Sequence, residues 1–278
     1  MIALLLALGS SLAYGCADFL GGLGARKAHV LRTVLIAAPA SLAVELALWP
    51  FLGASFSSGA LAWGTASGVA STAAFAPLYR TLAIGPMNVL SPITALVSAM
   101  LPVSVGLLQG EHLDLAGLVG LPLALAAVVL VSAGQGAGSA RPSRTALLLA
   151  FGAGTAIALQ LIFLHQAPAD SGVAPLIMGR AVSSALTLAA VGLMRRRLGT
   201  ERPAYAMSAT AGGLDALANL LFLLAARSGD LAVVAVVTAL YPASTVLLAR
   251  GVLSERIHRG QLVGLGTAAI AVSLLALP

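Results

Sequence analysis

The chain has 278 residues, of which 59% are hydrophobic and only 9% are charged. This leaves too little polar surface to cover a soluble globule, so the composition favours a membrane protein. The formal net charge is +6 with a single cysteine, Cys16, but no basic stripe with interleaved aromatic residues occurs. Nucleic acid is therefore excluded as a partner, and an internal disulfide or a cysteine-based metal cluster is excluded as well.

Ten apolar stretches follow one another, each of about the 20 residues that one membrane crossing requires. We expect spans at 2–24, 30–50, 58–79, 86–108, 113–134, 145–165, 172–194, 205–226, 231–251 and 258–277. No positively charged segment precedes the first stretch, so it is expected to be a retained span rather than a cleaved signal peptide. The fold class predicted is an all-α polytopic membrane protein with ten transmembrane helices.

The second half of the chain repeats the first at a constant offset of 144 residues. Gly85 falls on Gly229 and Glu111 on Glu255, and residues 94–121 share 9 identities in 28 positions with 238–265. The expected domains are a first repeat at 1–134, a Gly-, Ser- and Pro-rich linker at 135–144, and a second repeat at 145–278. Duplication in so apolar a chain is typical of transporters built from two halves.

An odd number of spans in each half makes the second copy enter from the opposite side, so the repeats are expected to be inverted. The basic residues agree, since 13 of the 15 fall in or beside the loops after the odd-numbered spans. These are Arg26, Lys27, Arg32, Arg80, Arg141, Arg144, Arg195, Arg196, Arg197, Arg202, Arg250, Arg256 and Arg259. The positive-inside rule then makes that face cytoplasmic and puts both termini outside a cell membrane.

The chain resembles the drug/metabolite transporter superfamily, specifically its ten-span carriers of the EamA type. Residues 90–132 and 237–277 carry the resemblance: a Pro-containing span ends in Gly110-Glu111 or Ser254-Glu255, and a short polar turn and a Gly-rich span follow. The segment LAYGCADFLGGLGARKA also resembles the first span of one bacterial branch. The resemblance implies a cavity lined mainly by spans 1, 3, 4, 6, 8 and 9. Many members are inferred to keep both termini in the cytoplasm, whereas the charges of this chain indicate the reverse.

Charged side chains inside the spans are functional candidates, because each costs a few kcal/mol to bury in lipid. Asp215 and Arg180 enter their spans from opposite faces to about 15 Å and 12 Å, so we expect them to share a central cavity, either paired or facing substrate. The alternative is a structural ion pair. Asp18 is a candidate proton or cation site, or else a helix-end carboxylate neutralised by nearby basic residues. Glu45, near the outer end of its span, is expected to extend to water.

Uncharged polar residues complete the candidate binding site. They are Tyr14 beside Asp18, Gln160 in span 6, Asn219 one turn after Asp215 in span 8, and Thr238 and Tyr241 in span 9. None of the charged candidates is repeated in the other half, since Asp18 falls on Ile162, Arg180 on Ile36 and Asp215 on Ser71. The scaffold is therefore expected to be symmetric and its chemistry asymmetric.

Two repeated features are expected to have mainly structural roles. Glu111 and Glu255 each stand just before a span, where a carboxylate can cap free N–H groups and face the positive end of the helix dipole. Pro92, Pro102 and Pro242 should kink spans 4 and 9 and are candidate hinges, although kinks that serve packing alone are an equal alternative.

The sequence thus predicts a secondary carrier that moves a small organic metabolite by alternating access. No Walker-type loop occurs, so no cofactor is expected, and any energy should come from a gradient of protons or another ion, or from the solute's own gradient. The expected partners are a small-molecule substrate and the lipid bilayer. The resemblance favours export, with uptake or lipid-linked flipping as alternatives, and a channel or scaffold subunit is a further one. An intramembrane enzyme is not expected, because no HExxH and no Ser/His constellation occurs.

Overall fold

The structure is a computed structural model that describes residues 1–278 except 26, 85–86, 133–142, 195–200, 254–257 and 277–278. For 75–84, 87–92, 249 and 253 it describes the backbone only. The described part is helical, without a named strand. The helices are α1 (Ile2–Ala25), α2 (Val30–Leu52), α3 (Ser58–Ile84), α4 (Met87–Leu108), α5 (Leu115–Ser132), α6 (Arg144–His165), α7 (Ala174–Met194), α8 (Tyr205–Ala226), α9 (Leu231–Thr238), α10 (Tyr241–Leu253) and α11 (Arg259–Leu275), with a short 3₁₀ turn, η1 (Ala169–Ser171).

Each expected span overlaps helix in the residues that the structure describes, and six helical stretches are long and apolar enough to cross a membrane. They are α1, α2, α6, α7, α8 and the stretch Leu231–Val252 that joins α9 to α10. Three shorter apolar helices lie at Ile93–Leu108, Leu115–Val131 and Arg259–Leu275. Many large apolar side chains on these helices are exposed, such as Leu115 and Leu193, as expected for surfaces that face lipid. The chain is a multi-pass membrane protein.

The ninth expected span is broken into two helices. α9 ends at Thr238, and α10 begins at Tyr241, next to Pro242. Proline has no N–H to offer the carbonyl of Thr238 four residues earlier, which explains why the helix stops there. α4, by contrast, continues as one helix through Pro92 and Pro102. The side chain of Pro92 lies outside the described residues.

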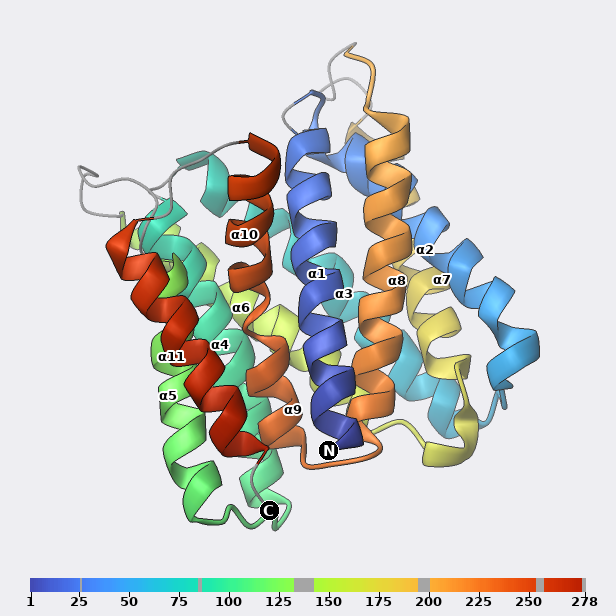
Figure 1. The fold of residues 1–278 in the computed structure, drawn as a ribbon. Coiled ribbons are helices and arrows are strands. Elements are labelled where there is room, and N and C mark those ends of the chain that lie inside the picture. Colours follow the sequence, from blue (N-terminus) through green and yellow to red (C-terminus); the bar gives the residue numbers. More distant parts are fainter. Residues whose placement is uncertain (26, 85–86, 133–142, 195–200, 254–257, 277–278) are drawn as a thin grey trace.

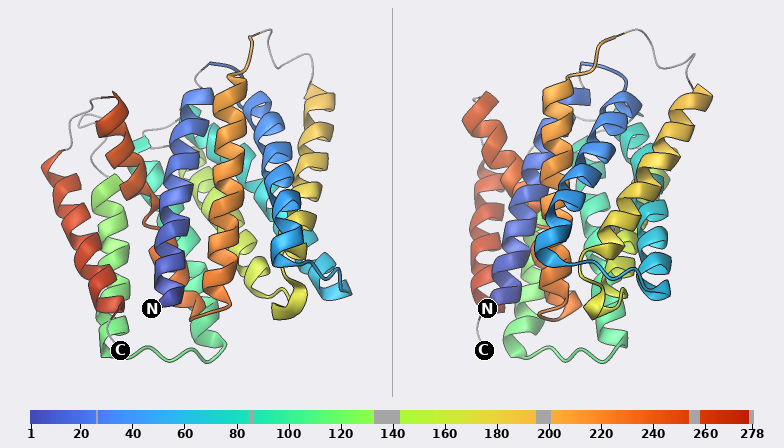
Figure 2. Two further views of the ribbon diagram at one scale, coloured as in Figure 1. Left: turned by 45° about the vertical axis from the view of Figure 1, so that its right-hand side comes forward. Right: turned by 90° about the vertical axis from the view of Figure 1, so that its right-hand side faces the viewer.

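The helices run between two ends of the bundle that differ in charge (Figure 1, Figure 2). The N-terminus, the end of α11 and the α4–α5 and α8–α9 connections lie at one end, here called the termini end. The opposite end, here called the basic end, carries every Lys and Arg whose side chain is described except Arg180 and Arg227, namely Lys27, Arg32, Arg144, Arg202, Arg250 and Arg259.

Helix contacts occur twice, once in each form, because a shift of 144 residues turns one contacting pair of helices into another contacting pair. α1 packs on α8 and α6 on α3, and likewise α2 packs on α8 and α7 on α3. α4 contacts α6, and α9 and α10 both contact α1. The outer flanks are formed by α5 with α11 and by α2 with α7 (Figure 1).

Two glycines that are equivalent under the offset allow the closest helix contacts. A Cβ on Gly68 of α3 would overlap the carbonyl oxygen of Gly179 in α7, and one on Gly212 of α8 would overlap the carbonyl oxygen of Ala37 in α2. Membrane helices use small residues at such crossings, because backbones can then approach closely. These positions hold the flank helices α2 and α7 against the centre of the bundle.

Gly212→Ala is expected to lower the stability of the protein by about 1–3 kcal/mol, because the added methyl group meets backbone that cannot move away alone. Thermal unfolding in detergent would show this as a lower Tm. Gly152→Ala is the matched control, since a Cβ there meets nothing within 4 Å. Equal Tm values for the two variants would contradict the close-contact argument.

Candidate functional site

A cavity of about 110 Å³ lies at mid-height between α1, α3, α4, α6, α8 and the α9–α10 break. Six of the eight residues that the sequence nominated for binding line it: Tyr14, Asp18, Gln160, Asp215, Thr238 and Tyr241. Ser98 of α4 is a polar lining residue that the sequence did not nominate. The helix break brings Thr238 and Tyr241 to the cavity from two separate helices, α9 and α10.

The lining residues differ in their access to solvent. Asp18 is exposed and Asp215 retains 29% side-chain exposure, whereas Gln160 and Thr238 are buried. Asp18 lies seven residues from the last residue of α1, Ala25, which is at the basic end. Solvent therefore reaches the cavity from the side of the basic end.

A charged cluster adjoins the cavity behind Asp215. Arg180 Nη2 lies 2.5 Å from Asp215 Oδ2, and Arg180 Nε lies 3.7 Å from Glu45 Oε1. Arg180 Nη1 donates to Ser71 Oγ at 3.5 Å, and Ser41 Oγ donates to Asp215 Oδ2 at 3.4 Å. Arg180 is 5% exposed and Glu45 is 1% exposed, so this pairing takes place away from water.

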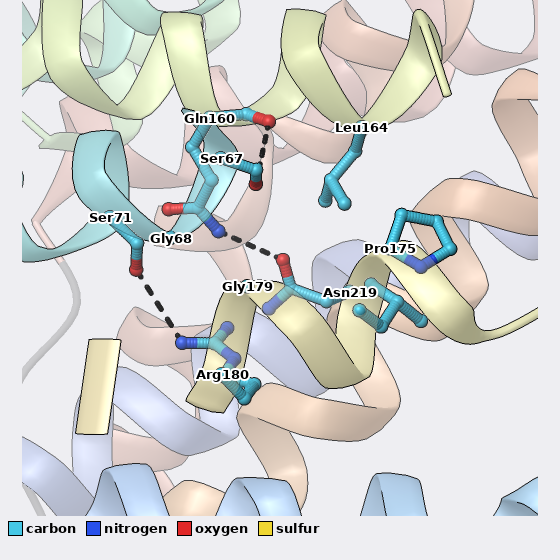
Figure 3. A pocket seen from close by; sticks show the side chains of 10 residues that line it. Ser67, Gly68, Ser71, Gln160, Leu164, Pro175, Gly179, Arg180 and Asn219 are labelled. Atoms are coloured by element: carbon cyan, nitrogen blue, oxygen red, sulfur yellow. Dashed lines mark hydrogen bonds between the residues drawn. The ribbon is translucent and has the colours of Figure 1, made fainter. Parts of the chain in front are cut away.

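Two amides extend the cluster toward α6. Gln160 Nε2 donates to Asn219 Oδ1 at 2.9 Å, and Asn219 Nδ2 donates to the carbonyl and the Oδ1 of Asp215 at 2.8 Å and 3.3 Å. Gln160, Asn219 and Arg180 border a second space of about 10 Å³, close to the lower limit for one water molecule (Figure 3). Figure 3 shows Arg180 and Ser71 facing each other across it. The second space is too small to hold a solute.

All eight nominated residues thus lie in one connected region, of which Arg180 and Asn219 form the buried rear. The expectation that Glu45 extends to water is wrong: its carboxylate is turned inward beside Arg180. Hydropathy places Glu45 near a helix end, but only the tertiary packing of α2 on α7 and α8 shows which way it faces. Ser41 and Ser71 were also missed, because serine is common in membrane helices and gives no separate signal.

One buried polar atom in the described lining of the cavity has no hydrogen-bond partner. Thr238 Oγ1 is buried and accepts or donates no hydrogen bond within the described part of the chain. Two tyrosines flank the same region, with the ring centroids of Tyr14 and Tyr241 6.5 Å apart. Asp18 forms no salt bridge with any described residue, so its carboxylate is also available to a ligand.

The termini end is closed below the cavity. A buried apolar cluster fills it, contributed by α1, α6, α7, α8 and α9 and including Leu4, Leu164, Leu176, Phe222, Leu223, Leu231 and Val234. Beneath it, Arg227 at the end of α8 donates to the carbonyls of Gly172 and Pro168 and to Ser171 Oγ at 2.9–3.1 Å. Burial lowers the pKa of Arg227, and the nearby Asp170 carboxylate acts in the opposite direction.

Glu111 caps a helix, but not the one that the sequence suggested. Its Oε1 accepts from the backbone N–H of Leu231 at 2.6 Å and its Oε2 from that of Ala232 at 2.9 Å, so it caps α9 in the other half of the chain. The following helix, α5, is capped instead by Asp114, whose Oδ1 accepts from Gly117 N–H at 2.7 Å. The expectation that Glu111 caps the next span is therefore wrong. Glu255 lies outside the described residues.

Comparison with known proteins agrees with this arrangement. Residues 144–277 match the model of the EamA-like transporter family. A solved crystal structure is similar over 99% of this chain and 96% of its own, with a TM-score of 0.80 and 15% sequence identity. At this identity the likeness shows the fold alone. A search of the curated proteins finds no match.

Proposed function

We propose, from the premise that this chain belongs to the EamA-like transporter family through its residues 144–277, that it is a secondary active transporter for a small organic metabolite. The main observation behind this proposal is the polar cavity at mid-height. Residues from both halves of the chain line it, and it is closed at one end only. A carrier needs such a site, reached from one side at a time.

The transport cycle that we propose is alternating access by two inverted five-helix repeats, 1–134 and 145–278, which together cross the membrane ten times. The exchange of helix contacts under the offset supports this symmetry, as do the equivalent crossings at Gly68 and Gly212. The break at Pro242 is a candidate hinge, and Pro102 and Pro92 are the corresponding candidates in the first half. Opening the termini end requires separating Glu111 from α9, which joins the two halves.

The orientation that we propose puts the basic end in the cytoplasm and both termini outside the cell membrane. The described side chains support it, because six of the eight Lys and Arg among them lie at the basic end. The cavity in its present state would then receive solute from the cytoplasm, which suits export driven by a proton or another ion. Uptake, or flipping of a lipid-linked solute, uses the same fold and is the alternative.

The test is a solute panel in proteoliposomes, with and without a pH gradient. Saturable flux that the gradient stimulates is expected for the wild type, and Asp18→Asn should abolish the stimulation, since an amide cannot exchange a proton at neutral pH. Asp230→Asn makes the same chemical change at an exposed loop position and should leave the flux unaltered. Flux that neither saturates nor responds to the gradient would indicate a channel instead of a carrier.

A further inference from the structure

We infer that the cavity selects an organic ammonium, which its carboxylates Asp18 and Asp215 hold in preference to anionic or zwitterionic solutes. The inference rests on the proposed transport function for its physiological meaning, but it concerns binding and can be tested alone.

The first step is the balance of charge inside the bundle. Among the side chains that the structure describes, those between the two ends of the bundle include three carboxylates, Asp18, Glu45 and Asp215, and a single guanidinium, that of Arg180. One cation cannot neutralise three anions, and charge within a bilayer is costly unless it is paired. A cationic ligand at the cavity supplies the missing partner.

The second step is that Arg180 is not available to an anionic group of a solute. Its guanidinium forms ion pairs with Asp215 and Glu45 and donates a hydrogen bond to Ser71. It does not line the main cavity, where Asp18 and Asp215 are the charged residues among the described lining. The carboxylate of a zwitterion would therefore meet two like charges without a compensating cation among the described lining residues, which disfavours the zwitterion that an arginine and two carboxylates first suggest.

The third step is an independent sign of a ligand. Thr238 is 2% exposed and lines the cavity, and its buried Oγ1 lacks a hydrogen-bond partner among the described residues. A buried hydroxyl without a partner costs free energy that a ligand would recover. It can accept from an ammonium N–H or pair with a hydroxyl elsewhere on the solute.

The aromatic pair and the volume define the kind of ammonium. Tyr14 and Tyr241 line the cavity beside Asp18 and Asp215, and the face of a tyrosine ring attracts an organic cation within about 6 Å. A volume of about 110 Å³ is smaller than the cavity of about 150 Å³ that holds benzene. The expected ligand is thus a compact alkylammonium, not a large planar drug.

The experiment compares solutes of nearly equal shape and different charge. Purified protein is heated with butylammonium or choline as cations, with 3,3-dimethylbutanol as the neutral isostere of choline, with 3,3-dimethylbutyrate as the anion, or with glycine betaine as the zwitterion. The cations are expected to raise the Tm by roughly 3 °C or more at saturation, and the other three solutes by less than 1 °C, because only a bound ligand shifts the folding equilibrium. Asp18→Asn and Asp215→Asn should each remove the cation-induced rise, and Asp230→Asn should keep it.

Flux of the same solutes into proteoliposomes separates this inference from the transport function. Saturable flux of glycine betaine or 3,3-dimethylbutyrate, with no Tm rise from either cation, would overturn the inference and leave the carrier intact. A cation-induced Tm rise that depends on Asp18, without flux of any solute, would support the inference and refute transport. If Asp215→Asn fails to fold, Asp18→Asn still decides, since Asp18 is exposed and bears no salt bridge to any described residue.

Discussion

Arg180→Gln is expected to cause the largest loss of stability of any single change in the cavity region, about 3–5 kcal/mol. The reason is that removing one member of a buried ion pair leaves the other charge without compensation. Here two carboxylates lose their partner at once, those of Glu45 and Asp215, and Glu45 is almost fully buried. Thermal unfolding in detergent measures the loss, and transport should fall with it because Asp215 is no longer held at the cavity.

A double-variant cycle gives this prediction its control. In the Arg180→Gln background, Glu45→Gln should restore part of the lost Tm, because it removes one of the two uncompensated charges. In the wild-type background the same Glu45→Gln change should destabilise or be neutral. Additive effects of the two substitutions would show that Arg180 and Glu45 do not interact energetically, contrary to the geometry.

The second large effect is expected for Glu111→Ala. The carboxylate accepts two hydrogen bonds from the first turn of α9, and a charge-assisted bond of this kind contributes roughly 1.5–3 kcal/mol before solvent screening. Since Glu111 and α9 belong to different halves, its loss should loosen the termini end in particular. A cysteine introduced at Val234, a position that is 1% exposed, should then react faster with a water-soluble maleimide in a Cys16→Ser background.

Asp114→Ala is the matched comparison for Glu111→Ala. Asp114 caps α5 within its own half, three residues from Glu111 and with similar local chemistry. Its loss should lower the Tm without accelerating the labelling at position 234. If both variants accelerate labelling equally, the contact of Glu111 with α9 does not specifically hold the termini end closed.

The sequence predicts the helices well because hydropathy and span length are local properties. It nominates Asp18, Arg180 and Asp215 for a similar reason, since a charge in an apolar run is visible without knowledge of its surroundings. It does not show what each charge faces. The partner of Glu111 lies 120 positions away, and the inward orientation of Glu45 depends on the packing of α2 against α7 and α8.

The break between α9 and α10 falls between these cases. Pro242 marks a kink in the sequence, yet Pro102 occupies a helix of the other half that continues unbroken. Proline removes one hydrogen bond wherever it stands, and the neighbouring helices determine whether the chain bends or separates into two helices. That outcome places Thr238 at the cavity without a hydrogen-bond partner in the described part of the chain, which the residue alone could not indicate.

The contacts of Arg180 bear on how two duplicated halves diverge. Its guanidinium reaches both Asp215 and Ser71, and these two residues occupy the same position in the two copies of the repeat. One arginine therefore contacts two positions that are equivalent in the repeat, and only one of them holds an acidic residue. The charge at the binding site is thus set by which copy of the repeat carries the carboxylate, because Arg180 contacts this position in both copies.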